Sequence, residues 1–279
     1  MSLVFPTINS SDTKISSYCN FIEYNCFVND EISFDELDIN EYTSTFTNVI
    51  DELKRRLDLY DTFIPYEIKK NKIISKLPNK KQYLYYSYCL YYSLKGGNSD
   101  SKITNIFEKI SDLSLKNYFG TSSSIITSIG QDSGLLINKI DSISDRLFET
   151  IGNKEVIPPK AKDGSIDIIT FKPIDKRGNQ LICLTDATIG KSWKDDKVVN
   201  IQLNKWKQFI HFKCEPTTCL SIVHVVSSED FKTASFNNGL LFDRTRVVKY
   251  YYNSEYVNNI FDDLELELNV WINSLQWSL

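Results

Sequence analysis

Apolar residues recur every three to four positions along much of this chain, which is the spacing of one helical face. The first such stripe begins near Asn40 and runs to Leu57. Pro65 fits the first turn of a second helix, which ends before Pro78. The same spacing predicts further helices over 82–94, 101–119, 134–151 and 254–277. Before residue 38 the pattern is weak and turn formers are frequent, so we expect loops with short elements there.

Short apolar runs bounded by turn formers predict strands in the second half of the chain. They are IDIITFKPI (166–174), QLICLTDATI (180–189) and the segments 219–226 and 239–252, while 199–212 fits a helix or a strand. Helices followed by strands with covering helices are typical of an α/β (α+β) fold. The polar segment GGNSDS, residues 96–101, is the best boundary. It separates a helical N-terminal region for recognition or partner binding, 1–98, from an α/β domain, 99–279.

Composition places the chain among ordinary folded proteins. It has 279 residues, of which 42% are hydrophobic and 24% charged, so it can bury a core and is not a disordered chain. A net charge of −4 argues against a surface coated with nucleic acid, although a local basic groove would still bind it. The six cysteines form no CxxC pair, and no apolar run has membrane length. We therefore expect a cytoplasmic protein with reduced thiols and no membrane association.

Three acids stand where an apolar pattern does not require them. Asp167 lies at the start of the first predicted strand, Asp186 lies within the second, and Glu108 is in the middle of the helix predicted over 101–119. Carboxylates are the side chains that hold Mg²⁺ against a phosphate. If the helix packs beside the two strands, these carboxylates converge on one or two ions. The alternative is structural, with Glu108 solvated, Asp186 bound to backbone amides at a strand end and Asp167 capping the loop that enters its strand.

A helix with an internal glutamate, then an acid, a strand, a turn and a strand with a second acid, is similar to the PD-(D/E)xK phosphodiesterase superfamily. The stretch KDGSIDII also resembles openings found in some bacterial defence nucleases. The resemblance covers about residues 101–193. It implies a restriction-endonuclease-like mixed sheet flanked by helices and hydrolysis of phosphodiester bonds. It also implies Mg²⁺ (or Mn²⁺) bound by Glu108, Asp167 and Asp186, with DNA favoured over RNA as the substrate, in anti-phage defence.

The chain departs from that family at one position. The family places a lysine two residues after the second acid, where this sequence has Thr188. Lys191, just past the strand, is the favoured substitute as a catalytic residue beside Asp167 and Asp186, since Lys172 is expected on the opposite strand face from Asp167. The alternative is a catalytically degenerate relative that acts as an interaction or regulatory subunit of a defence complex.

Three other groups of residues carry weaker signals. Four side chains with nitrogen or sulfur ligands could bind zinc tetrahedrally: His211, Cys214, Cys219 and His224. No two of them have the close spacing of a zinc knuckle, so buried cysteines and hydrogen-bonded histidines are the more common interpretation. The tyrosine-rich segment 83–92 beside Lys80 and Lys81 fits base stacking or, more often, a packed core helix. In FDRTRVV, 242–248, a structural pair between Asp243 and a neighbouring arginine is favoured over phosphate binding.

Overall fold

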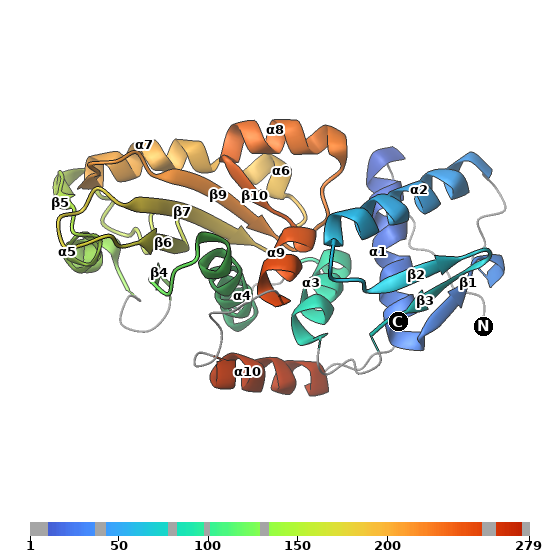
Figure 1. Ribbon diagram of the computed structural model, residues 1–279. Helices are drawn as coiled ribbons and strands as arrows, with labels where there is room; N and C mark the ends of the chain where they lie inside the picture. The colour runs from blue at the N-terminus through green and yellow to red at the C-terminus, as the bar shows by residue number, and fades with distance from the viewer. Residues whose placement is uncertain are drawn as a thin grey trace.

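The computed structural model describes residues 11–36, 43–77, 83–97, 101–128, 134–252 and 261–274. Its centre is a five-stranded mixed sheet in the order β10-β9-β7-β6-β4 (Figure 1). The strands are β4 (Ser124–Ile126), β6 (Ile168–Lys172), β7 (Leu181–Thr188), β9 (Thr217–Ile222) and β10 (Leu240–Phe242). β4, β6 and β7 pair antiparallel, and β7, β9 and β10 pair parallel. The mixed sheet confirms the predicted α/β (α+β) class.

Helices cover both faces of this sheet because its strands are apolar on both sides. One core includes Ile168 and Cys183 and packs against helices α3 (Leu84–Lys95), α4 (Ser101–Phe119), α9 (Arg244–Tyr252) and α10 (Phe261–Ser274). The other includes Ile169 and Leu184 and packs against α5 (Leu136–Leu147), α7 (Val199–Phe209) and α8 (Ser228–Asn238). Figure 1 shows α7 and α8 on one side of the sheet and α4, α9 and α10 on the other. Alternate residues of β6 and β7 therefore enter different cores.

The N-terminal region has its own small core. Helices α1 (Ser11–Asn29) and α2 (Thr43–Tyr60) pack on a three-stranded sheet in the order β1-β3-β2. The strands are β1 (Glu31–Ser33), β2 (Tyr66–Lys69) and β3 (Lys72–Ser75), and a 3-10 turn, η1 (Phe34–Glu36), follows β1. The remaining short elements lie in the sheet domain. They are β5 (Thr150–Ile151), η4 (Lys154–Val156), α6 (Trp193–Asp196) and β8 (Ile210–His211). None of the helices in the described ranges has the length and apolar character to span a membrane.

Most long predicted elements are confirmed, and three predictions are wrong. α1 fills a segment expected to be loops, because its polar residues, such as Asn20 and Glu23, are buried and hide the apolar stripe. The helix predicted after Pro65 is the β2–β3 hairpin, whose two-residue turn is Lys70-Asn71. The strand predicted over 239–252 stops at Phe242, and helix α9 follows it.

A buried ionic network joins the N-terminal region to the sheet domain. The predicted pair between Asp243 and a neighbouring arginine is wrong, because the Arg244 side chain points to α1 instead. Its Nη2 donates to Glu23 Oε2 at 2.9 Å, and Arg56 Nη1 of α2 donates to Glu23 Oε1 at 2.8 Å. All three side chains are fully buried. Breaking such a pair leaves an uncompensated buried charge, so the network holds the two regions in one arrangement.

Candidate metal centre

Asp167 sits where the β6 ladder begins. Its N–H donates to Thr185 O at 2.9 Å, and its C=O accepts from Thr127 N–H at 2.8 Å, so its backbone is fixed between β7 and the end of β4. Its carboxyl Oδ2 accepts from Ala187 N–H at 2.8 Å. The bond runs to the neighbouring strand β7, whereas the structural alternative expected a cap on the loop that enters β6. It also places the carboxyl group beside Asp186.

The carboxyl groups of Asp167 and Asp186 are close enough for each to affect the pKa of the other. Burial raises the pKa of Asp186 above its ordinary value, against the opposing effects of Lys197 and Asp167. Burial also raises the pKa of Asp167 well above its ordinary value, and the charges of Asp186 and Glu108 add to the effect. Two buried acids whose pKa values are both raised mark a position where positive charge is favourable.

Glu108 reaches the same cluster from α4. The side chain is buried, and its Oε2 accepts a hydrogen bond from the Ser128 hydroxyl that follows β4. Burial raises the pKa of Glu108 to about 7, and the charges of Asp163 and Asp186 act in the same direction. The structure thus brings the three predicted acids into mutual electrostatic contact, from a helix and two adjacent strands.

Asp163 is a fourth acid that sequence reasoning missed. It lies in the turn KDGS, where Gly164 and Ser165 have φ of 59° and 62°, and its Oδ1 accepts from Ser165 N–H at 2.7 Å. A Cβ on Gly164 would lie 3.0 Å from a Leu136 methyl group, so the turn requires glycine there. The charge of Asp163 acts on Glu108 and Asp186. The Asp-Gly turn four residues before Asp167 is the signal that could have found it.

The lysine at this cluster is Lys197, which the sequence did not single out. Its Nζ donates to Asp186 Oδ1 at 2.8 Å and to Oδ2 at 3.0 Å. Burial lowers the pKa of Lys197, but the charges of Asp186, Asp167 and Asp163 outweigh burial and raise it overall. A tight ion pair with a buried carboxylate explains that result.

The lysines and the threonine weighed from the sequence lie elsewhere. Lys191 packs its aliphatic chain against the backbone of Gly96, where a Cβ would approach its Cε to 3.2 Å, and its charge acts on His224. Lys172 donates to Phe119 O at 3.2 Å. Thr188 Oγ1 accepts from Gly190 N–H at 3.1 Å in the turn that leaves β7. Among the described residues, Lys197 contacts Asp186, whereas Lys191 and Lys172 make the other contacts given above.

The donor set of the cluster fits a hard divalent cation. Asp167, Asp186 and Glu108 offer carboxylate oxygens, which suit Mg²⁺ and Mn²⁺ rather than soft metals. No group of three or more His, Cys, Asp or Glu in the described ranges is already arranged as a metal-binding set. The ammonium of Lys197 opposes metal binding, since it contacts both oxygens of Asp186 that a metal would use. Metal binding therefore requires this ammonium to be displaced.

The four zinc candidates do not assemble. Cys219 is fully buried in β9 and contacts Cys183, whereas Cys214 is exposed. His224 Nε2 is 3.1 Å from Gly190 O, and burial lowers the pKa of its ring to about 4. Their environments are those of core residues and a free surface thiol, and the described residues hold no such metal group.

The tyrosine-rich helix is a core element. In α3, four of the tyrosines are buried: Tyr85, Tyr86, Tyr88 and Tyr92. Tyr88 and Tyr92 pack against Trp271 of α10. Lys80 and Lys81, the basic neighbours weighed for base stacking, lie outside the described residues. The aromatic rings therefore contribute to packing and are not a surface on which bases stack.

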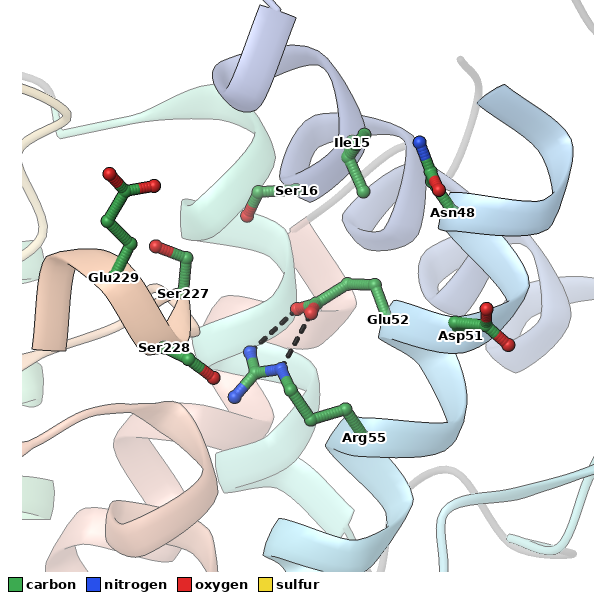
Figure 2. A pocket seen from close by; sticks show the side chains of 9 residues that line it. All are labelled: Ile15, Ser16, Asn48, Asp51, Glu52, Arg55, Ser227, Ser228 and Glu229. Atoms are coloured by element: carbon green, nitrogen blue, oxygen red, sulfur yellow. Dashed lines mark hydrogen bonds and ion pairs between the residues drawn. The ribbon is translucent and has the colours of Figure 1, made fainter. Parts of the chain in front are cut away.

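A pocket of about 400 Å³ lies away from the acid cluster, between α1, α2 and the start of α8. Figure 2 shows Ser227, Ser228 and Glu229 on one wall, with Glu52 and Arg55 opposite. Arg55 is bound to Glu52 at 2.7 and 2.8 Å and to Val226 O at 3.0 Å. Since the guanidinium is already paired, this pocket does not offer a free cation to a ligand.

No family model, curated protein or solved structure matches this chain.

Proposed function

We propose that this protein is a metal-dependent nuclease that hydrolyses phosphodiester bonds of nucleic acid. The observation that carries the proposal is the convergence of Glu108, Asp167 and Asp186. Buried acids that raise one another's pKa are costly to a fold, and such clusters occur most often at functional sites. DNA is the favoured substrate over RNA, and anti-phage defence is the favoured setting. Both follow from the resemblance of KDGSIDII and its surroundings to defence nucleases.

The architecture supports a restriction-endonuclease-like reading of the sheet domain. The two acid-bearing segments, β6 with its preceding residue and β7, are adjacent antiparallel strands in the middle of a mixed sheet. The helix that carries Glu108 packs against both. This is the order of helix, acid, strand, turn and strand on which the resemblance rests.

The chemistry follows from the residues at the cluster. Asp167 and Asp186 would hold Mg²⁺ or Mn²⁺, with Glu108 as a third oxygen donor. A bound divalent ion would supply an acidified water as nucleophile and would neutralise charge on the phosphate. The backbone bond from Ala187 fixes the orientation of the Asp167 carboxyl group. Glu108, which is oriented by its hydrogen bond from Ser128, would bind the metal or transfer a proton from the side of α4.

The second candidate function is an interaction or regulatory subunit that retains the fold without catalysis. It is favoured by Thr188 at the position of the family lysine and by the ion pair of Lys197 with Asp186, which occupies both carboxylate oxygens. In that case the acids would serve only to join β6, β7 and α4. A protein partner in a defence complex would then carry the activity.

Cleavage assays separate the two. Supercoiled plasmid and single-stranded RNA are incubated with Mg²⁺ or Mn²⁺, with chelator as the blank. We expect cleavage that falls more than about 100-fold in Asp167→Asn and Asp186→Asn, because a lost ligand removes several kcal/mol of transition-state stabilisation. Asp195→Asn, an exposed acid of α6, is the matched control and should cleave normally. Metal-dependent cleavage that survives both substitutions would place the site elsewhere, and inactivity on both substrates without metal binding would favour the subunit.

A further inference from the structure

Lys197 lies on the side of Asp186 that a metal ion would use. Its ammonium contacts both carboxylate oxygens, at 2.8 and 3.0 Å, and the Asp186 side chain is only 6% exposed. An ammonium that contacts both oxygens of a carboxylate occupies the position at which a cation would bind the two oxygens most closely. Lys197 and a metal ion therefore compete for the same oxygens.

The backbone around Lys197 is anchored, while its side chain is not enclosed. Lys194 of α6 pairs with Asp230 of α8 at 2.5 Å, and Val199 N–H donates to Asn238 Oδ1 of α8 at 2.8 Å. The Lys197 side chain itself is 30% exposed. A lysine side chain has four rotatable carbon–carbon bonds beyond its Cα, so its ammonium can leave Asp186 without any movement of α6 or α7.

We propose that Lys197 is a built-in counter-ion that holds Asp186 in the metal-free protein and is displaced when a divalent cation binds. This role rests on the proposed function and defines how the same site is controlled. The ion pair keeps a buried carboxylate compensated while no metal is present. Once displaced, the ammonium would be available to a substrate phosphate, because the α6–α7 connection that carries Lys197 stays anchored to α8. The chain thus obtains from the α6–α7 connection the positive charge that Thr188 does not supply.

Titration calorimetry with Mn²⁺ tests this role without any activity measurement. Lys197→Met removes the competing charge and keeps the side-chain length, so we expect Mn²⁺ to bind about tenfold more tightly than to wild type, which corresponds to about 1.4 kcal/mol. Lys197→Arg keeps a cation beside Asp186 and should stay close to wild type. Lys194→Met is the control, because Lys194 belongs to the same helix but pairs with Asp230. Unchanged or weaker binding by folded Lys197→Met would overturn the proposal.

A second measurement uses the wild-type chain, in case Lys197→Met does not fold. Acylation of lysine amines, mapped by mass spectrometry, is compared with and without saturating Mn²⁺. Labelling of Lys197 should rise on Mn²⁺ binding and that of Lys194 should not. Unchanged labelling of Lys197 in Mn²⁺-bound protein would overturn the counter-ion role alone. Absence of Mn²⁺ binding by the wild type would overturn the proposed function and this role with it.

Discussion

Glu108 is a buried residue whose ionised carboxylate lowers the stability of the folded protein. Burial raises its pKa from 4.5 to about 7, the charges of Asp163 and Asp186 add to this, and the Ser128 hydrogen bond opposes it. An acid whose pKa is higher in the folded protein than in the unfolded chain stabilises the fold only while protonated. Its contribution is complete below the unfolded value and is lost as the pH rises through the folded value. The metal-free protein should therefore lose stability between those two pKa values.

Glu108→Gln removes that loss, since the amide keeps an oxygen for Ser128 but cannot ionise. Without metal, we expect its free energy of unfolding to exceed that of wild type by about 1–3 kcal/mol near pH 8 and by less near pH 4. Urea unfolding over a pH series measures the difference. Glu155→Gln, an exposed glutamate, is the control. A Glu108→Gln protein less stable than wild type near pH 8 would show that ionised Glu108 is not costly.

The sequence marks some site residues and hides others. Glu108, Asp167 and Asp186 are visible because each interrupts or adjoins an apolar pattern in a regular element. Lys197 lies eleven positions after Asp186, in a polar connection whose path depends on α6 and on its ties to α8. Asp163 depends on a turn with two consecutive residues at positive φ. Side chains placed by turns and connections leave no periodic signal, so Lys197 could be found only from the structure, and the Asp-Gly pair is the one sequence cue to Asp163.

At the scale of elements, Asp243 decides where β10 ends and α9 begins. Its Oδ1 accepts from Thr245 Oγ1 at 2.6 Å and from Arg246 N–H at 3.2 Å, which caps the first turn of α9. Its Oδ2 accepts from Val226 N–H at 3.2 Å and so fixes the segment after β9. The apolar run over 239–252 predicts one strand because both β10 and α9 are largely buried. The helix cap at Asp243 separates the strand from the helix.

Asp243→Ala removes a cap and leaves buried donors without partners. We expect the free energy of unfolding to fall by about 2–3 kcal/mol. Denaturant unfolding gives the value, with Asp145→Ala as the control, because Asp145 is an exposed aspartate of α5 whose loss should cost less than about 0.5 kcal/mol. If Asp243→Ala cost no more than the control, the cap would not be what sets the start of α9.

At the scale of the whole molecule, the fold class could be predicted and the assembly of its parts could not. Alternating helical and strand patterns are local, so a mixed sheet with covering helices follows from them. The contact of Arg244 with Glu23 joins positions 221 residues apart, and no local pattern indicates it. The boundary between residues 98 and 99 stays a prediction, since α3 on its N-terminal side packs into the same core as α4 and α10.

The central claim is that the acids at β6, β7 and α4 form one metal centre. Anomalous diffraction from crystals soaked in Mn²⁺ tests it most directly. We predict a peak bonded to the carboxylates of Asp167 and Asp186, with Lys197 turned away from Asp186, and no peak there in Asp186→Asn crystals. Crystals saturated with Mn²⁺ that show no peak at these carboxylates, with Lys197 still bridging Asp186, would contradict the account.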